Sequence, residues 1–474
     1  MRSEFILLGA IFIPVCGAFI LPLLGRVSCR LRNFFALLLI LASCALSLKL
    51  IPLVLSGETI IIHKPLVLGF NFSFCADALA VFMACISSFL SALILIYSWD
   101  YISHYENQNE YYAMVVMFLG SMMGLVFSAN LILLYVFWEM TAITSWRLIG
   151  FFREKAYVQR ADKAFLITMF GAVLMLMGFI MIYQQTGSFQ LNTGVISNLA
   201  ICFILCGILS KSATLPFQTW LPDAGVAPSP VTALLHAAIL VKIGVYVFAR
   251  IFLASFSFPD FWRTALLLIA AISALVSAGA ALVDTDLKRI IAYSTISQIG
   301  FIFFGLAVGN AVATSGALLY ILMHGLSKAG LFLCAGIIEQ NTKTRDITKL
   351  GGLMHTMPLT GLAFLFCSFS VMGIPPFGGF FAKFMVFSGA AQSGRLGIAF
   401  LFLIGAFGTI LYLFRVFNLV FMGEAKPGAA KEGSPLMVVI VILLAILSLL
   451  GGIFINYSAG FTQFITASLP GVIR

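Results

Sequence analysis

The sequence predicts an all-α polytopic membrane protein, and three observations lead to this fold class. Hydrophobic residues make up 62% of the 474 residues, charged residues make up only 9%, and the mean hydropathy is +1.10. Soluble domains carry far more charge than this. The apolar residues fall in runs of about 20, the length of a helix that crosses a bilayer, whereas a membrane β-barrel shows short alternating segments.

About fourteen apolar runs define the predicted transmembrane helices. The first run could be a signal peptide, but Arg2 alone is a weak basic region and no small-residue cleavage site follows, so we interpret it as helix 1. The runs fall near 4–24, 33–55, 76–99, 112–128, 130–149, 162–184, 196–214, 231–254, 262–283, 289–308, 312–338, 358–393, 397–422 and 436–456. The seventh and twelfth are irregular, and we expect breaks at Pro216 and at Pro375 and Pro376.

Basic residues are distributed unequally between the two sets of alternate loops. One set contains thirteen, and the other set, termini included, contains seven. Because basic loops stay in the cytoplasm, both termini are predicted outside, in the plasma (inner) membrane of a prokaryote. The same bias explains the formal net charge of +10, since the chain has no basic tract or soluble module that could bind nucleic acid.

No linker or low-complexity segment divides the chain, so we predict a single membrane domain over 1–474. Within it, EMTAITSWRLIGF echoes AYSTISQIGFIFF, KAFLITMFG echoes KAGLFLCAG, and the LPF break has a counterpart in PPF. Five helices per repeat would make the two repeats inverted across the membrane. We expect helices 1–3 over 1–111, the first five-helix repeat over 112–256, the second over 257–423, and helix 14 with the C-terminus over 424–474.

The strongest functional signal is the segment 211–244, KSATLPFQTWLPDAGVAPSPVTALLHAAILVKIG. Lys211 ends one apolar run, a proline-rich break follows, and the next run contains His236 and Lys242. Irregular backbone and ionisable groups are costly inside a bilayer and usually line an ion or substrate path. On a regular helix His236 and Lys242 point about 120° apart, so they can belong to one hydrated path without touching.

Glu139 lies deep in predicted helix 5, where a carboxylate must be paired or neutralised. We expect Lys211 to be its ion-pair partner, and a static structural salt bridge is the alternative. Moving a carboxylate toward or away from a lysine changes the proton affinity of that lysine. Such a pair could work as a pump element without any cofactor.

Four more cations are candidates for the same path. His324 and Lys328 are four residues apart on one face of a predicted helix, which is typical of a proton relay. Lys383 could reach the outer interface, but the helix break beside it favours a path terminus. Lys163 either reaches the interface or belongs to the first ion path. Arg147, near the end of predicted helix 5, has no evident role.

The chain carries no signature of a redox or catalytic centre. Its nine cysteines are scattered, and none forms a C-x-x-C pair. No P-loop, dinucleotide motif, nucleophile triad or metal cluster is present. We therefore expect no cofactor, metal ion or catalytic residue on this chain.

Five segments, FWEMTAITSWRLIGF, the 211–244 segment, DLKRIIAYSTISQIGF, HGLSKAGLFL and IPPFGGFFAKF, occur in an order that resembles one known family. The chain resembles the antiporter-like subunits of respiratory complex I, of Mrp-type Na+/H+ antiporters and of membrane-bound nickel–iron hydrogenases. The resemblance implies fourteen core helices, broken helices 7 and 12, and a proton path of buried charges along the membrane midplane. By position it assigns roles to Glu139 and Lys211 as the coupling pair, Lys242 as the linking lysine, His324 with Lys328 as a relay, and Lys383 as the exit.

The main hypothesis is a proton-translocating subunit of a redox-driven complex of the hydrogenase or complex I type. GIIEQNTKTRDITKLGGL resembles hydrogenase subunits and the large Mrp subunit, whereas FFAKFMVF resembles the proximal complex I subunit or the smaller Mrp subunit. Since the sequence stops after run fourteen, we expect neither a lateral helix nor extra C-terminal helices. The hypothesis implies iron–sulfur clusters, with a nickel–iron centre or flavin, in soluble cytoplasmic partners. Other antiporter-like and small membrane subunits would complete the complex, and the ion would be H+ or Na+.

The alternative is a subunit of an Mrp-type cation/H+ antiporter without redox chemistry, which would use the same residues. A scaffold that only anchors soluble subunits would not need charges within several apolar helices. No residue of the chain supports a quinone pocket. Composition and motifs alone leave the first two hypotheses open.

Overall fold

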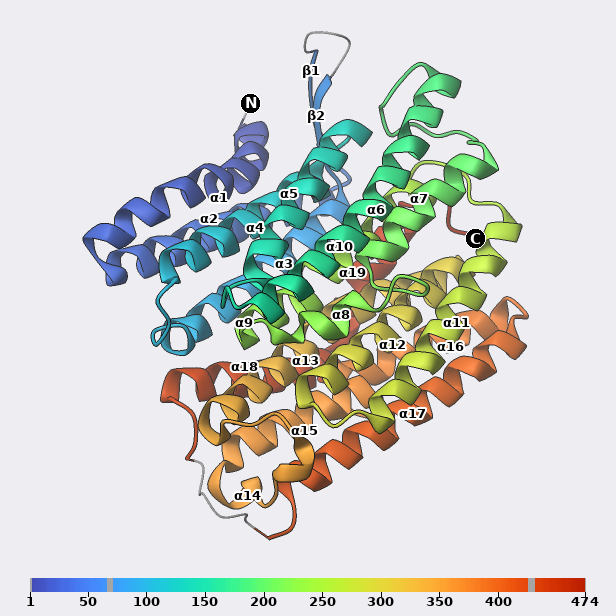
Figure 1. The fold of residues 1–474 in the computed structure, drawn as a ribbon. Helices are drawn as coiled ribbons and strands as arrows, with labels where there is room; N and C mark the ends of the chain where they lie inside the picture. Colours follow the sequence, from blue (N-terminus) through green and yellow to red (C-terminus); the bar gives the residue numbers. More distant parts are fainter. Residues whose placement is uncertain (1, 66–70, 425–430, 474) are drawn as a thin grey trace. The chain divides into compact units, whose positions relative to one another are not determined.

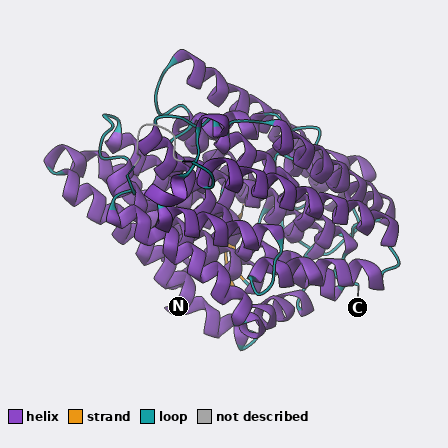
Figure 2. Cartoon of the chain, turned by 90° about the horizontal axis from the view of Figure 1, so that it is seen from below, coloured by secondary structure: helices purple, strands orange, loops and turns teal. Residues whose placement is uncertain are grey.

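The computed structural model describes residues 2–65, 71–424 and 431–473, and most of these residues are helical (Figures 1 and 2). Within these ranges, twelve helices are long and apolar enough to cross a membrane. Two shorter apolar helices, α7 (Asn198–Lys211) and α15 (Pro358–Met372), end where the sequence predicts breaks. The all-α, multi-pass fold class is confirmed. Of the basic residues used for the orientation, Lys426 and Arg474 lie outside the described ranges.

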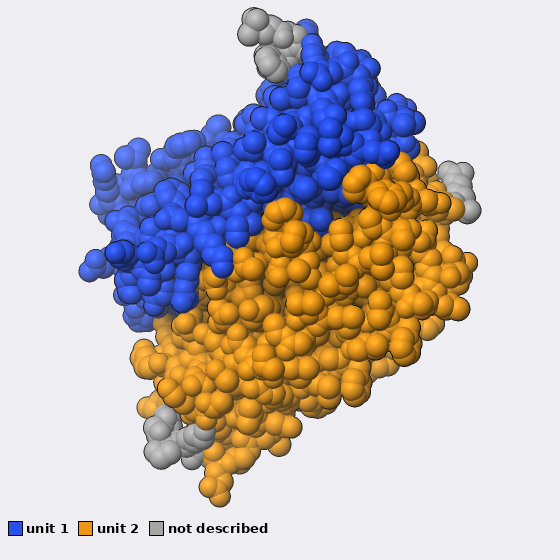
Figure 3. Space-filling view, turned by 45° about the vertical axis from the view of Figure 1, so that its right-hand side comes forward, with its two compact units in different colours: residues 1–211, 238–257 blue, residues 212–237, 258–474 orange. Residues whose placement is uncertain are grey.

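The chain divides into two compact units, which Figure 3 colours separately. Unit 1 comprises 1–211 and 238–257, and unit 2 comprises 212–237 and 258–474. The division near 257 lies next to the expected boundary between the two repeats, whereas 212–237 joins the second unit. The single membrane domain and the inverted relation of the repeats stay predictions.

Among its described residues, unit 1 contains eight α-helices, a β-hairpin and a π-helical turn. The hairpin was not predicted, because the alternating burial of Ile60 and Ile62 continues for too few residues to give a strand signal. Its register places Ile60 opposite Ala76 and Pro65 opposite Asn71. The elements are α1 (Arg2–Val27), α2 (Cys29–Leu55), β1 (Ile60–Pro65), β2 (Asn71–Ala76), α3 (Ala78–Tyr101), α4 (Gln108–Phe127), α5 (Leu131–Ile149), α6 (Lys155–Thr186), α7, α10 (Leu240–Phe248) and a π-helical turn (Ala249–Leu253).

Unit 2 is organised around α13 (Ala311–Thr342), which is buried over most of its length. The last predicted run, 436–456, corresponds to α18 and to the first residues of α19. The rest of α19 lies beyond the predicted run. The other elements are α8 (Trp220–Asp223), a 3-10 turn (Ala224–Val226), α9 (Ser229–Ala233), α11 (Asp260–Val283), α12 (Leu287–Val308), a 3-10 turn (Ile347–Lys349), α14 (Leu353–Thr356), α15, α16 (Gly378–Gln392), α17 (Leu396–Phe421), α18 (Pro435–Ile453) and α19 (Ile455–Ala467).

The two predicted helix breaks are confirmed. After α7 the chain leaves the helix at Ser212, passes Pro216, and becomes helical again at Trp220. After α15, Gly373 adopts φ +85°, a left-handed conformation that glycine tolerates, and its N–H donates to the Phe369 carbonyl at 3.0 Å. Proline has no N–H to continue a helix, so each break leaves carbonyl groups at the end of a half-helix without their usual donors.

The membrane span predicted near 231–254 is present as Ser229–Leu253, but it is not a regular helix. A π-helical turn spans Leu234–Ala238, and Ile239 departs from helical geometry with φ −128° and ψ −72°. A second π-helical turn follows at Ala249–Leu253. Because π-helical turns advance by less than 100° per residue, the angle of about 120° between His236 and Lys242 does not hold.

A partly buried ion pair secures α3 in unit 1. Asp77 is the N-cap of α3 and accepts a hydrogen bond from the Ala80 N–H at 2.9 Å. The Arg250 guanidinium binds both of its carboxylate oxygens, at 2.5 and 2.7 Å, and contacts Tyr246 at 3.0 Å. Burial alone would raise the pKa of the Asp77 carboxyl, but Arg250 outweighs burial and the pKa lies below 3.8.

We predict that Arg250→Ala lowers the free energy of unfolding by about 2 kcal/mol, because it leaves the partly buried Asp77 carboxylate without its counter-ion. The measurement is the apparent melting temperature of the detergent-solubilised protein. The stabilisation is fully present above pH 3.8 and is lost as the pH falls through the lower pKa of the folded carboxyl. Arg395→Ala is the control, since its contact with Asp260 is 3.9 Å long and Asp260 is exposed. Equal melting temperatures for both variants would contradict the prediction.

Candidate functional site

Lys211 is the last residue of α7, and its side chain is fully buried in unit 1. Its Nζ donates to the Trp138 carbonyl at 3.2 Å and lies 5.2 Å from the centroid of the Trp138 ring. Both contacts favour an ammonium group. The helix break after Lys211 places the side chain at the C-terminal end of a half-helix, where the helix dipole also favours a cation.

The expected direct ion pair between Glu139 and Lys211 is wrong in this structure. Within the described ranges no carboxylate oxygen lies within 4.0 Å of the Lys211 Nζ, although the two charges interact electrostatically at longer range. The Glu139 Oε1 atom is buried and makes no hydrogen bond to the described residues. On α5 the Trp138 carbonyl accepts the hydrogen bond from Lys211, and the carboxylate of the next residue, Glu139, does not contact the lysine. The acid and the base are therefore near each other but are not in contact.

Lys242 is the second buried lysine of unit 1. It lies on α10, has no exposed surface, and its Nζ finds no hydrogen-bond acceptor within the part of the chain that the structure describes. A buried ammonium without an acceptor is energetically costly, so a water molecule is the partner that such a site requires.

Lys328 and His324 lie on one face of α13, as predicted, and both are fully buried. The Lys328 Nζ donates to the Ile291 carbonyl at 3.2 Å and to the Ser294 hydroxyl at 2.5 Å, both on α12. His324 lies beside Tyr320, with ring centroids 6.0 Å apart. The predicted shared face is confirmed, and the partners of Lys328 are uncharged.

Lys383 lies on α16, and the end of its side chain reaches the second helix break. Its Nζ donates to the Val371 carbonyl at 2.7 Å, in the last turn of α15, and lies 4.6 Å from the Phe301 ring centroid. This repeats the arrangement of Lys211, with an ammonium at the C-terminal end of a half-helix. Lys383 also lines a cavity of about 990 Å³ whose other walls include Phe380 and Phe400.

His236 and Lys163 complete the predicted set. His236 lies in the π-helical turn of unit 2, is fully buried, and neither ring nitrogen has a hydrogen-bond partner within the described ranges. Its ring packs against Phe332, with centroids 4.4 Å apart. Lys163 lies on α6 and is partly exposed. Nothing in its position decides between an interfacial side chain and a member of the first path.

Arg147, without an evident role in the sequence, belongs to an ion-pair cluster in unit 1. It pairs with Glu110 of α4, whose second carboxylate oxygen contacts Arg153 at 2.5 Å. Nearby, the Trp146 indole N–H donates to Asp162 at 2.7 Å. The cluster ties the ends of α4, α5 and α6 together, so Arg147 has a structural partner 37 residues away that the sequence pattern did not reveal.

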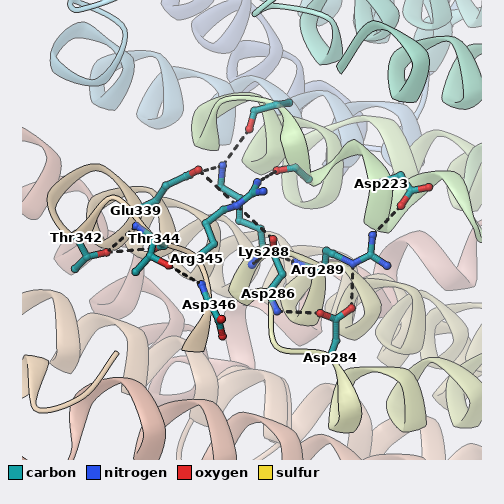
Figure 4. Close-up of polar contacts among 12 residues, drawn as sticks. Asp223, Asp284, Asp286, Lys288, Arg289, Glu339, Thr342, Thr344, Arg345 and Asp346 are labelled. Atoms are coloured by element: carbon teal, nitrogen blue, oxygen red, sulfur yellow. Dashed lines mark hydrogen bonds and ion pairs between the residues drawn. The ribbon is translucent and has the colours of Figure 1, made fainter. Parts of the chain in front are cut away.

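A second charged network lies in unit 2, at the N-terminus of α12 (Figure 4). Lys288 is only 1% exposed, donates to the Ala227 carbonyl at 3.0 Å, and pairs with Glu339 of α13 at 2.6 Å. Arg345 contacts the same carboxylate at 3.7 Å. Lys288 is therefore buried and paired although it lies in a run of charged residues over 284–289.

The neighbouring Arg289 connects the same turn to the segment after the first helix break. Its guanidinium contacts Asp284 at 3.0 Å and Asp223 of α8 at 2.8 Å (Figure 4). Asp286 caps α12 by accepting from backbone N–H groups and contacts Arg345 at 3.3 Å. The whole network therefore holds the segment after the broken helix against α12 and α13.

Comparison with known proteins shows the family. The model described as "NADH:quinone oxidoreductase/Mrp antiporter, TM" matches residues 128–411. The chain belongs to this family. The model described as "NADH-Ubiquinone oxidoreductase (complex I), chain 5 N-terminus" matches residues 67–112. The resemblance derived from the sequence motifs is thereby confirmed.

Two relatives, both named as subunits of Na(+)/H(+) antiporters, are similar to most of this chain. The one from Staphylococcus haemolyticus is 33% identical over 94% of this chain and 60% of its own length. The one from Alkalihalophilus pseudofirmus is 35% identical over 87% of this chain and 56% of its own length. The chain thus spans about 60% of the length of such relatives.

Two solved structures have the same fold. A chain of the Mrp complex from Dietzia sp. superposes with a TM-score of 0.91 at 19% identity, and 99% of this chain and 98% of that chain are covered. A chain of the membrane-bound sulfane sulfur reductase, an archaeal respiratory membrane complex, gives 0.89 at 23% identity, with 98% and 97% covered. Members of the family fold alike in both kinds of complex, so the fold by itself does not separate the two hypotheses.

Sequence reasoning missed the uncharged polar residues of unit 2. Ser294 and Gln298 lie four residues apart on α12, and both are fully buried. Tyr412 of α17 donates to Ser294 at 2.6 Å, and Tyr320 donates to Gln298 at 2.6 Å. Ser294 and Gln298 could have been found from their spacing as polar residues within the apolar run after Leu287. They were missed because only charged residues and histidines were considered as candidates.

We predict that Glu339→Gln destabilises the protein by about 3 kcal/mol, because the buried Lys288 ammonium loses its carboxylate. The measurement is again the melting temperature in detergent. Lys349→Ala is the control, since Lys349 is exposed and lies 3.8 Å from Asp346, and exposed pairs contribute little. A melting temperature unchanged in Glu339→Gln would show that the Ala227 carbonyl alone holds Lys288.

Proposed function

We propose that the chain is an ion-translocating subunit of an Mrp-type multisubunit cation/H+ antiporter. It would lie in the bacterial plasma membrane with both termini outside and would assemble with other antiporter-like and small membrane subunits. The curated relatives, which are named as Na(+)/H(+) antiporter subunits, favour this alternative over the redox-driven hypothesis. The chain covers only part of those relatives, so the activity of the whole complex belongs to the proposal.

One observation carries the proposal. Lys211, Lys328 and Lys383 are buried in membrane helices, each donates to a backbone carbonyl, and within the described ranges none has a carboxylate within 4.0 Å. A carboxylate partner would hold a proton in place. A carbonyl accepts a hydrogen bond from the ammonium and from the neutral amine alike, so these side chains can gain and lose a proton without leaving their positions.

The pair of Glu139 and Lys211 would receive the coupling signal. Because the two charges interact without touching, a small movement of either helix changes their attraction steeply. In unit 1, Lys242 would be the next proton-transfer group. In unit 2, the proton-transfer groups would be His236, His324, Lys328 and Lys383. Lys163 would join the first path only if it titrates during exchange.

Exchange by everted membrane vesicles tests the proposal. The chain is expressed with its neighbouring genes in a strain without antiporters, and a ΔpH-sensitive dye reports proton release when Na+ is added. We expect exchange that needs a ΔpH and no electron donor. Nickel and iron are measured in the purified complex, because iron–sulfur or nickel–iron partners in constant ratio, with no Na+-dependent exchange, would overturn the proposal in favour of a redox-driven complex.

We predict that Lys211→Ala and Glu139→Ala each lower the exchange rate by about 100-fold or more, since a missing proton-transfer group removes at least this factor. Assembly, followed by co-purification of the partner subunits, should stay normal. Glu154→Ala and Lys155→Ala are matched controls, because both residues are exposed in unit 1. Wild-type ΔpH formation by either test variant would refute the role of the pair.

A further inference from the structure

The buried ammonium of Lys328 is connected to a chain of uncharged side chains in unit 2. Its Nζ donates to the Ser294 hydroxyl at 2.5 Å, and the Tyr412 hydroxyl lies 2.6 Å from the same oxygen. Ser294 is therefore shared by the lysine and the tyrosine. All three residues are fully buried and come from α13, α12 and α17.

The chain continues one helical turn further along α12 and α17. Gln298 lies four residues after Ser294, and its amide nitrogen donates to the Thr409 hydroxyl at 3.1 Å. Tyr412 also interacts with Thr409 and Gln298. The Tyr320 hydroxyl donates to the Gln298 carbonyl oxygen at 2.6 Å. The amide nitrogen and the amide oxygen of Gln298 each have a hydrogen-bond partner, so this side chain is fixed in one orientation.

The chain ends beside Lys383. The Lys383 Nζ lies 5.5 Å from the centroid of the Tyr320 ring, and the charges of Lys328 and Lys383 interact. The last transfer, from the Tyr320 hydroxyl to the Lys383 amine, therefore needs a water molecule or a rotation of the lysine side chain. Tyr412 and Tyr320 both contact Gln298 rather than each other, so the transfer between them also needs a water molecule. Lys328, Ser294 and Tyr412 are already within hydrogen-bond range of their neighbours.

We propose that Ser294, Tyr412 and Tyr320 form a neutral relay that passes a proton between Lys328 and Lys383, with Gln298 and Thr409 as positioning residues. The inference rests on the proposed function of the chain as an ion-translocating subunit. It assigns transport roles to residues that carry no charge and lie outside the predicted set of Lys, Glu and His side chains.

The transfer balances at each step. The Lys328 ammonium gives a proton to the Ser294 oxygen, and Ser294 releases its own hydroxyl proton toward Tyr412. Tyr412 releases its own proton to an intervening water molecule, which gives one of its protons to Tyr320. Tyr320 then protonates the Lys383 amine. Each hydroxyl ends with one proton, as it began, and one positive charge has moved from Lys328 to Lys383.

The same hydroxyls also suit both states of Lys328. A hydroxyl group can accept a hydrogen bond from an ammonium and, after rotation, donate to a neutral amine. A carbonyl such as that of Ile291 can only accept. Ser294 is thus the contact of Lys328 that can reverse its polarity, and Tyr412 is placed to reverse with it.

We predict that Tyr412→Phe and Ser294→Ala each lower the maximal exchange rate by about 10- to 100-fold, the factor expected when a charge-assisted hydrogen bond is lost. The Na+ concentration for half-maximal exchange should not change. The assay uses the complete complex in everted vesicles. Tyr111→Phe and Ser327→Ala are matched controls, since Tyr111 and Ser327 are equally buried and are hydrogen-bonded to serines at 2.7 and 2.9 Å.

A pH profile separates a relay from a packing defect. The relay variants should show a shifted pH dependence of exchange, whereas the controls should keep the wild-type profile. The titratable groups facing Lys328 and the relay are His236, His324, Tyr320, Lys383 and Cys367, the last next to Gly330 of α13. None of them is altered in the test variants, so a shift reports the loss of the hydroxyl.

The outcomes distinguish this inference from the proposed function. If Lys328→Ala is inactive while Tyr412→Phe keeps the wild-type rate, or if the controls lose as much as the test variants, the relay is overturned and the antiporter hypothesis stands. If the wild-type complex exchanges no Na+ for H+, infrared difference spectra between two pH values decide on the relay. A Tyr412 band that is absent in Lys328→Met supports it, and a band that persists there overturns it.

Discussion

The structure depends on one constraint, which is that an ammonium group inside apolar membrane helices must find oxygen atoms. The second helix break supplies one directly, because Lys383 donates to the Val371 carbonyl in the last turn of α15, where the helix ends and a carbonyl lacks its usual donor. Lys211 and Lys328 donate instead to carbonyls within the continuous helices α5 and α12. The first break places Lys211 at the C-terminal end of a half-helix, where the helix dipole favours a cation.

The charged networks at the helix ends serve a different purpose from the buried lysines. Glu110 with two arginines, Asp77 with Arg250, and the cluster around Lys288 and Glu339 all combine opposite charges at short distance. Paired charges hold elements in place, and the last cluster holds the segment after the first break. Lys211, Lys328 and Lys383 of the proposed path contact carbonyls and a hydroxyl instead. In the proposed function, this difference in partners separates the transport residues from the structural ones.

The choice between two kinds of complex follows from relatives rather than from geometry. The fold is shared by a chain of an Mrp complex and by a chain of an archaeal respiratory complex, so the fold is compatible with either kind of complex. The proposal of an antiporter subunit rests on sequence likeness to named antiporter subunits. The arrangement of Glu139 and Lys211, close but not in contact, is compatible with either driving force.

The sequence by itself determined the elements that depend on local chemistry. Runs of about 20 apolar residues specified the helices, prolines specified both breaks, and isolated charges within apolar runs singled out the buried lysines and histidines. Tertiary structure alone decided which oxygen each lysine meets. A carbonyl looks the same at every position of a sequence, so the Trp138 carbonyl could not be told from any other as the partner of Lys211. The π-helical turns at His236, the pairing of Arg147 with Glu110, and the contact between Tyr412 and Ser294 join residues on different helices or depend on packing. Such contacts have no local sequence signal, because the free energy that selects them comes from close packing in three dimensions.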